Sequence, residues 1–171
     1  STIIPLPCRS VKQIRANLYE SFKLFTFTTD DIIGDSTRVS VSYKGLIGDL
    51  SVGDRILVNN GLVVFQVTQL RDTEAVCKTV IGGTLSNRKS MSFPNKIMSG
   101  PYLSEQDKAD LLFGIANDVD YVAASFVSTK EDAQELRQFL NENGGANIDI
   151  IAKIENRAGV DNIEQICEAC E

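Results

Sequence analysis

Two hydrophobic patterns occur along the chain, and the first covers residues 22–97. Short runs of alternating apolar and polar residues follow one another there, and residues that favour turns separate them. The predicted strands cover residues 22–28, 38–43, 55–58, 62–70 and 75–80. A tight hairpin is expected at Asn59-Asn60-Gly61, because these residue types tolerate a positive φ. The pattern predicts a small antiparallel β-barrel domain.

After Pro94 the pattern changes to an alternation of helices and strands. The residues from Ser104 to Asp107 resemble a capping box at the start of a helix, and Ser128 and Thr129 begin a similar signal. The predicted elements are a helix over 104–115, a strand over 121–127, a helix over 128–143, a strand over 148–154 and a helix ending near residue 170. The apolar residues expected on the inner faces of the helices are Leu111, Leu112, Ile115, Leu136, Phe139, Leu140, Val160, Ile163 and Ile166.

This αβαβα order is typical of a parallel sheet with helical crossovers. Two parallel strands would leave both edges of their sheet open, and a (β/α)8 barrel normally takes about 250 residues. Residues 98–171 are therefore interpreted as part of a (β/α)8 barrel. Residues 1–21 contain a short apolar strand over 1–4 and a weakly helical stretch over 9–19, and we interpret them as a remnant of the barrel's N-terminal region.

Composition narrows the chemistry available to these 171 residues, which are 43% hydrophobic and carry a formal net charge of -6. The acidic balance disfavours nucleic acid and anionic membranes as partners. Because the sequence has no histidine, it excludes Ser-His and Cys-His catalysis and histidine-ligated zinc. Carboxylates, lysines and metals bound through oxygen remain. A reducing cytosol is expected, since the cysteines are scattered and neither a secretory signal nor a membrane-spanning run is found.

One predicted strand ends in two charges. Apolar residues fill most of 150–154, as in a parallel strand covered on both faces, but Lys153 and Glu155 stand at its end. Alternate residues of a strand share a face, so these two residues are expected about 7 Å apart along one face. Charges at the carboxyl end of a parallel strand indicate a ligand, metal or substrate site. A solvated ion pair would explain the same pattern, and the residues alone leave both interpretations open.

Six motifs follow one another along the chain: Thr28-Thr29-Asp30-Asp31, Gly53-Asp54-Arg55-Ile56-Leu57, Gly82-Gly83-Thr84-Leu85, Ser104-Glu105-Gln106-Asp107-Lys108, Ala124-Ser125-Phe126 and Lys153-Ile154-Glu155-Asn156. In this order they resemble motifs of the pyruvate kinase family. The resemblance implies a small β domain inserted after the third strand of a (β/α)8 barrel and closing over the active site. The two predicted parallel strands would then be the barrel's fourth and fifth.

The resemblance also implies an activity and roles for four residues. The family transfers a phosphoryl group from phosphoenolpyruvate to ADP, which gives pyruvate and ATP. Lys153 would stabilise charge on the phosphoryl and enolate oxygens, and Glu155 would bind Mg²⁺ or Mn²⁺. Ser125 and Phe126 would form part of the substrate pocket.

A basic pair, Arg88 and Lys89, follows Gly82-Gly83 in the predicted β domain. Such residues either face an anion or are solvated surface, and the resemblance places this pair near the nucleotide. The resemblance further implies a K⁺ ion whose ligands are not in this sequence, a homotetramer, and a cytoplasmic enzyme.

The chain also departs from the family's pattern. Asn59 and Asn60 stand where the family usually has two aspartates, and the strands bearing its potassium ligands and second metal ligand are not found. Residues 1–11 faintly resemble the first barrel strand. We therefore expect the 171 residues alone to be inactive. Two other interpretations stay open: a metal-dependent lyase or aldolase acting on phosphoenolpyruvate or pyruvate, and a non-catalytic interaction module.

Overall fold

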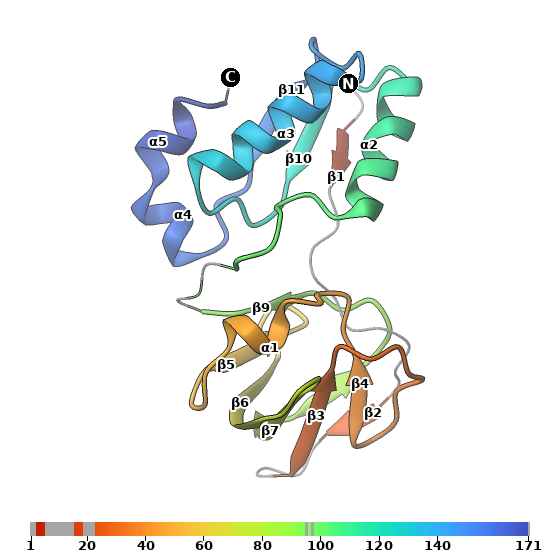
Figure 1. The fold of residues 1–171 in the computed structure, drawn as a ribbon, viewed down its shortest axis with the longest axis vertical. Helices are drawn as coiled ribbons and strands as arrows, with labels where there is room; N and C mark the ends of the chain where they lie inside the picture. Colours follow the sequence, from red (N-terminus) through yellow and green to blue (C-terminus); the bar gives the residue numbers. More distant parts are fainter. Residues whose placement is uncertain (1–2, 6–15, 19–22, 95, 97, 171) are drawn as a thin grey trace. The chain divides into compact units, whose positions relative to one another are not determined.

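The computed structural model describes residues 3–5, 16–18, 23–94, 96 and 98–170 (Figure 1). The chain folds as two compact units. The α/β unit comprises Ser1–Cys8 and Gly100–Glu171, and the β unit comprises Arg9–Ser99. The β unit is therefore inserted between two segments of the α/β unit, and this arrangement confirms the predicted fold class.

The β unit is built on a six-stranded sheet with the order β4-β3-β7-β6-β5-β9, together with a two-stranded sheet of β2 and β8. Its elements are β2 Ala16–Leu18, β3 Leu24–Thr28, β4 Arg38–Ser40, α1 Leu46–Asp49, β5 Arg55–Val58, β6 Val63–Leu70, β7 Glu74–Ile81, β8 Gly83–Leu85 and β9 Met91–Ser92. Each of the predicted strands is confirmed in place. The helical prediction over 9–19 is wrong at Ala16–Leu18, which form a strand, and its remaining residues lie outside the described ranges.

One pairing in the large sheet differs from the antiparallel prediction. Strands β3 and β4 run parallel, with Thr26 opposite Arg38, whereas the other pairs in this sheet are antiparallel. The parallel direction arises because the loop over 29–37 runs back along β3 before β4 begins.

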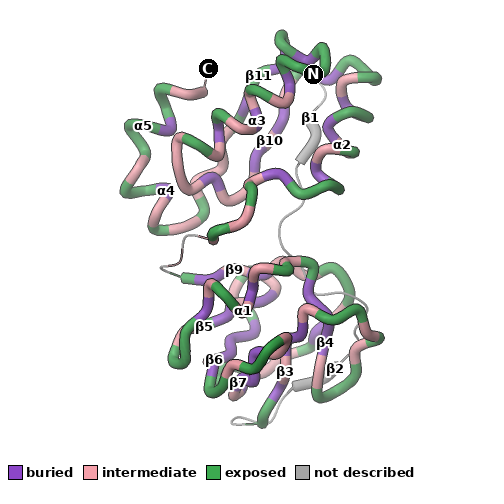
Figure 2. The backbone as a smooth tube through the Cα atoms, viewed as in Figure 1, coloured by how far each residue is buried: buried purple, intermediate pink, exposed green. Residues whose placement is uncertain are grey.

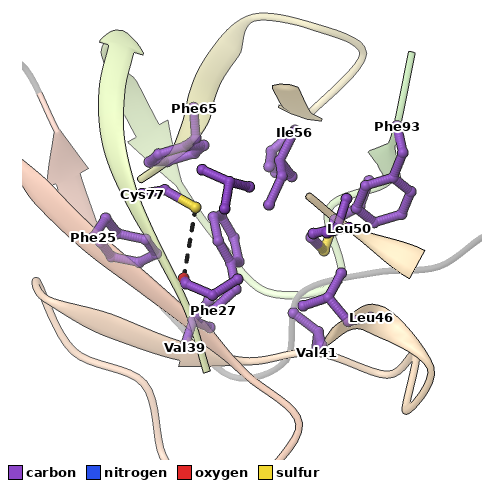
Figure 3. Close-up of a cluster of buried hydrophobic side chains, with 14 of the residues drawn as sticks. Phe25, Phe27, Val39, Val41, Leu46, Leu50, Ile56, Phe65, Cys77 and Phe93 are labelled. Atoms are coloured by element: carbon purple, nitrogen blue, oxygen red, sulfur yellow. Dashed lines mark hydrogen bonds between the residues drawn. The ribbon is translucent and has the colours of Figure 1, made fainter. Parts of the chain in front are cut away.

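Alternation along the strands places the core of the β unit on one side of the sheet. Phe25, Phe27 and Phe65 are fully buried, and their ring centroids lie 4.9 to 5.4 Å apart in edge-to-face and tilted arrangements (Figure 3). Cys77 packs in the same cluster, where burial raises the pKa of its thiol to about 12. This cysteine is therefore a core residue and remains protonated at neutral pH.

The hairpin between β5 and β6 confirms the prediction for Asn59-Asn60-Gly61. These residues have φ angles of 55°, 57° and 82°, and Val58 pairs with Val63 across the turn. Asparagine and glycine adopt this left-handed region more easily than other residues, so the sequence specifies the turn locally.

The α/β unit contains a parallel three-stranded sheet with the order β1-β10-β11. Its elements are β1 Ile3–Pro5, α2 Glu105–Ala116, β10 Tyr121–Ala124, α3 Lys130–Glu142, β11 Asp149–Ala152, α4 Arg157–Asp161 and α5 Ile163–Cys167. The two strands predicted within residues 98–171 are β10 and β11, and the sheet gains a third strand because β1 pairs with one edge of β10. Ile3–Pro5 thus form a strand within the stretch whose residues faintly resemble the first barrel strand, and the other residues of that stretch, 1–2 and 6–11, lie outside the described ranges.

Two helices begin as their capping signals indicate. Ser104 and Thr129 each accept a hydrogen bond from the backbone of the third helical residue, whose aspartate side chain bonds back to the cap. On α3, Ala133, Leu136 and Leu140 are buried, and Figure 2 shows this helix alternating between buried and more exposed positions. Both capping predictions are confirmed.

Three residues expected on inner helix faces are exposed. Leu112 is 47% exposed because α2 instead buries the face that carries Leu111 and Gly114. The single last helix expected from the sequence is broken at Asn162 into α4 and α5, and this break leaves Val160 and Ile163 facing outward. Ile166, which was also expected on the inner face of this last helix, is buried.

The three-stranded sheet has one covered and one open face within the described residues. Val122 and Ile150 are buried against the helices, in one cluster with Leu136. Ile151, which points to the other side of β11, is 42% exposed. The expectation that both faces of this strand are covered is therefore wrong for the described part of the chain. Among these residues no helix is long and apolar enough to cross a bilayer.

Candidate functional site

The candidate site lies where β10 and β11 end. The two strands pair in register up to Ala124 and Ala152, and the Lys153 N–H still donates to the Ala124 carbonyl at 2.9 Å. This register brings the residues after each strand side by side. The Lys153 ammonium accordingly donates to the Ser125 hydroxyl oxygen at 3.0 Å.

Lys153 and Glu155 point to the same side, as strand alternation predicts. The Lys153 Nζ lies 3.3 Å from Glu155 Oε1, and the two side chains are 40% and 34% exposed. An ion pair this exposed adds little to folding stability. Stability alone is therefore a weak reason for placing these charges at the strand end, and a role at a site explains them better.

Phe126 contributes its backbone to the same cluster. Its N–H donates to Glu155 Oε2 at 3.0 Å, and its φ is 56°. A bulky residue rarely adopts this left-handed conformation, and such outliers concentrate at functional sites. All four residues that the sequence assigned to this part of the site, Ser125, Phe126, Lys153 and Glu155, are thus brought together.

Asn156 joins the two loops that carry these residues. Its Nδ2 donates to the Ser128 hydroxyl at 2.8 Å, and its Oδ1 accepts from the Gly159 N–H at 2.7 Å as the cap of α4. The Ser128 hydroxyl in turn donates to the Phe126 carbonyl at 3.0 Å. No role was assigned to Asn156 from the sequence, although an asparagine before a helix is a recognisable capping signal.

Gly159 allows the two loops to approach closely. A Cβ atom at this position would lie 2.6 Å from the Val127 carbonyl oxygen and 3.2 Å from Ile154 Cγ2. Only glycine fits this contact without a backbone shift, so the residue type sets the distance between the loop after β10 and the helix after β11.

Tyr102 is a site residue that sequence reasoning missed. Its hydroxyl donates to the Ser125 carbonyl at 2.8 Å, and its own N–H donates to Glu135 Oε2 at 2.9 Å. The residues in contact are far apart in the chain and belong to no local pattern, so the sequence offers no signal for this contact.

Glu155 fits the role of one ligand of a hard cation. A carboxylate has about four lone-pair directions, and the Phe126 N–H and the Lys153 ammonium each engage one oxygen. The described residues contain no group of three or more acidic, cysteine or histidine side chains that could hold a metal. A cation at Glu155 would therefore take its other oxygen ligands from substrate, water or further protein groups.

Arg88 and Lys89 belong to the β unit, on the turn between β8 and β9. Arg88 is exposed and has φ 56°. The next residue along, Ser90, accepts a hydrogen bond from the Asn59 N–H at 2.9 Å and donates from its hydroxyl to Asn60 Oδ1 at 3.1 Å. Within the β unit, the basic turn therefore lies against the hairpin at 59–61.

Comparison with known proteins gives consistent matches. The family model for the pyruvate kinase barrel domain matches residues 11–171. A pyruvate kinase of Clostridium perfringens is 43% identical over 148 residues, covering 86% of this chain and 31% of the relative. A pyruvate kinase of Clostridium acetobutylicum is 39% identical over 157 residues, covering 92% of this chain and 33% of the relative.

A solved structure gives the same result. The crystal structure of a pyruvate kinase from Cryptosporidium parvum matches with a TM-score of 0.79 and 29% identity, covering 98% of this chain and 37% of that one. The chain thus spans about a third of the length of the curated relatives described here. These matches give no support to the lyase or aldolase interpretation.

Proposed function

Because the chain belongs to the pyruvate kinase family, we propose that the full protein transfers a phosphoryl group from phosphoenolpyruvate to ADP, giving pyruvate and ATP. One observation supports this most directly. The side chains of Lys153, Glu155 and Ser125 and the Phe126 N–H form one hydrogen-bonded cluster at the carboxyl ends of two parallel strands. Barrel enzymes place their chemistry at this end of the sheet.

Lys153 supplies positive charge to the reaction in this proposal. Phosphoryl transfer is accelerated mainly by positioning and by charge that stabilises the transition state. The Ser125 hydroxyl and the Glu155 carboxylate hold the Lys153 ammonium in place before substrate arrives. A preorganised ammonium can then stabilise negative charge on the phosphoryl and enolate oxygens without further reorganisation.

Glu155 is proposed as a ligand of a divalent cation, Mg²⁺ or Mn²⁺. Such a cation, when bound, neutralises phosphate charge and polarises the oxygen of the substrate. The carboxylate is oriented for this role by the Phe126 N–H, which fixes Oε2. The K⁺ ion expected for the family would take its ligands from residues outside this sequence.

The remaining assignments concern substrate contacts and organisation. Ser125 and Phe126 would line the pocket for phosphoenolpyruvate, and Arg88 and Lys89 would approach the nucleotide from the β unit. We propose the β unit, predicted over residues 22–97, as the small lid domain and residues 98–171 as the barrel part. Of residues 1–21, predicted as a barrel remnant, Ser1–Cys8 belong to the α/β unit, and the β unit begins at Arg9. A homotetramer in the cytoplasm is proposed on the same family grounds.

Replacement of Lys153 tests the function. In the full natural protein, Lys153→Met is expected to lower kcat for phosphoenolpyruvate-dependent ATP formation by about 10²-fold or more, because one preorganised charge acts mainly on the transition state. Lys108→Met is the matched control, since Lys108 forms its ion pair with Glu105 on α2 and takes no part in the cluster around Lys153. A coupled ATP assay measures both. Equal kcat values for Lys153→Met and the wild type would exclude the catalytic role of Lys153.

A further inference from the structure

A single peptide unit, the one between Ser125 and Phe126, is held at both of its ends. Its carbonyl oxygen accepts the hydrogen bond from the Tyr102 hydroxyl at 2.8 Å. Its N–H donates to Glu155 Oε2 at 3.0 Å. Tyr102 and Glu155 therefore lie at opposite ends of one peptide dipole and together fix the direction in which it points.

This direction is unfavourable for Phe126 taken alone. A φ of 56° brings the Cβ of a residue with a side chain too close to its own backbone, which is why L-residues seldom adopt it. Rotation of the Ser125–Phe126 peptide by half a turn would return Phe126 to a negative φ. The same rotation would remove the N–H from Glu155 and point the carbonyl oxygen toward its carboxylate. The relaxed orientation and the Glu155 contact are therefore incompatible.

The Tyr102 hydroxyl opposes this rotation, and the segment that carries Tyr102 is itself anchored. Glu135, on α3, accepts the N–H groups of Tyr102 and Leu103 on its two carboxylate oxygens, at 2.9 and 3.2 Å. Leu103 is only 1% exposed and belongs to the core of the α/β unit. The segment that carries Tyr102 is thus fixed by Glu135 of α3, through hydrogen bonds that do not involve the loop after β10.

We propose that Tyr102 is a positioning residue that keeps the Ser125–Phe126 peptide turned so that its N–H faces Glu155. Hydrogen bonds in series polarise one another, so the Tyr102 hydroxyl also strengthens the donation from this N–H. Glu155 is then held through Oε2, and Oε1 remains with Lys153 at 3.3 Å. The benefit to catalysis rests on the proposed function, whereas the orientation of the peptide does not.

Tyr102→Phe removes the hydroxyl and keeps the ring. In the full protein labelled with ¹⁵N-phenylalanine, we expect the Phe126 amide signal to move and its intraresidue NOE to Hα, which is strong at positive φ, to weaken severalfold. Phe126→Leu identifies the signal by removing it. Tyr121→Phe on β10 is the matched control and should leave the signal in place. An unchanged Phe126 signal in Tyr102→Phe would overturn the proposal, as would an equal change in Tyr121→Phe.

A second pair of variants tests whether Tyr102 acts against the backbone strain at residue 126 or whether its loss disturbs the site in general. Glycine adopts a positive φ without the steric cost, so in a Phe126→Gly background the Tyr102→Phe change should leave the residue 126 amide close to Glu155. With ¹⁵N-glycine labelling, the expected shift is much smaller than in the phenylalanine background. A shift of equal size would show that Tyr102 does not act against the strain at this residue, and would overturn the proposed cause.

Activity decides the catalytic part separately. If the wild type forms ATP from phosphoenolpyruvate, Tyr102→Phe is expected to lower kcat about tenfold, because small misplacements of catalytic groups are costly, and Tyr121→Phe should keep it. An unchanged kcat would overturn the catalytic part. An inactive wild type would instead contradict the proposed function, while the NMR comparison would still decide whether Tyr102 orients the peptide.

Discussion

The β unit and the α/β unit differ in where they leave large apolar side chains exposed. In the β unit such residues lie mainly in turns and loops, as Leu62 and Ile33 do, or near strand ends. In the α/β unit they lie within regular elements, with Ile151 inside β11 and Phe113 inside α2. The β unit therefore encloses its core with its own strands, whereas the α/β unit leaves one sheet face uncovered within the described residues.

This difference indicates that the two units draw their stability from different parts of the protein. Among the described residues, the core cluster of the β unit is formed by residues between Phe25 and Met98, so these contacts lie within one continuous segment. An apolar residue in the middle of a strand on an open face indicates packing against further protein. We therefore expect the β unit to be the more autonomous of the two.

The largest effect expected is on the β unit alone. Phe65→Ala should lower the free energy of unfolding of this unit by about 3–5 kcal/mol, because Phe65 is fully buried between two other rings. Native-state hydrogen exchange should show lost protection in β6 and β7 and unchanged protection in β10 and β11. Phe65→Leu, which keeps most of the volume, should cost less. Equal loss of protection in both units would contradict their independence.

A smaller effect tests the open face of the α/β sheet. In the 171-residue chain, Ile150→Ala should cost about 2–5 kcal/mol of unfolding free energy, because Ile150 is buried at 3% exposure. Ile151→Ala, the adjacent residue on the open face, should cost less than about 1 kcal/mol. Chemical denaturation of both variants measures the difference. Equal costs would mean that Ile151 is packed against protein, and the contrast between the units would lose its main support.

The smallest effect compares one glycine from each unit. Gly159→Ala should destabilise the α/β unit by about 1–3 kcal/mol, because the added methyl would meet the Val127 carbonyl at 2.6 Å. Gly48→Ala, within α1 of the β unit, has no atom within 4 Å of the new methyl and should be neutral or stabilising by up to about 1 kcal/mol. Thermal denaturation followed by circular dichroism distinguishes them. A stable Gly159→Ala variant would show that the two loops of the site can move apart.

Much of the fold and of the site was predictable from short stretches of sequence. The strands of the β unit, the hairpin at Asn59 and the caps at Ser104 and Thr129 are confirmed because each depends on residues within a few positions of one another. The shared face of Lys153 and Glu155 follows from the period of a strand in the same way. Their roles in catalysis remain proposals.

Other features were not predictable, because they depend on which segments meet. Leu112 and Val160 fit an apolar helix pattern, but Leu112 lies off the buried face of α2, and the helix break at Asn162 leaves Val160 exposed. Strand β1 has only three residues, and one of them is a proline. Its place in the sheet beside β10 could therefore not be assigned from the sequence.

The sequence by itself determined the local periods, the turns, the caps and the presence of two charges at one strand end, because backbone sterics and alternation act over a few residues. Only the tertiary structure decided that Ser125 lies opposite Lys153, that the Phe126 N–H reaches Glu155 and that Tyr102 holds the peptide between them. These contacts join residues 23 to 29 positions apart in the chain. Their distances are set by the parallel pairing of β10 with β11 and by Glu135, which anchors the segment before α2.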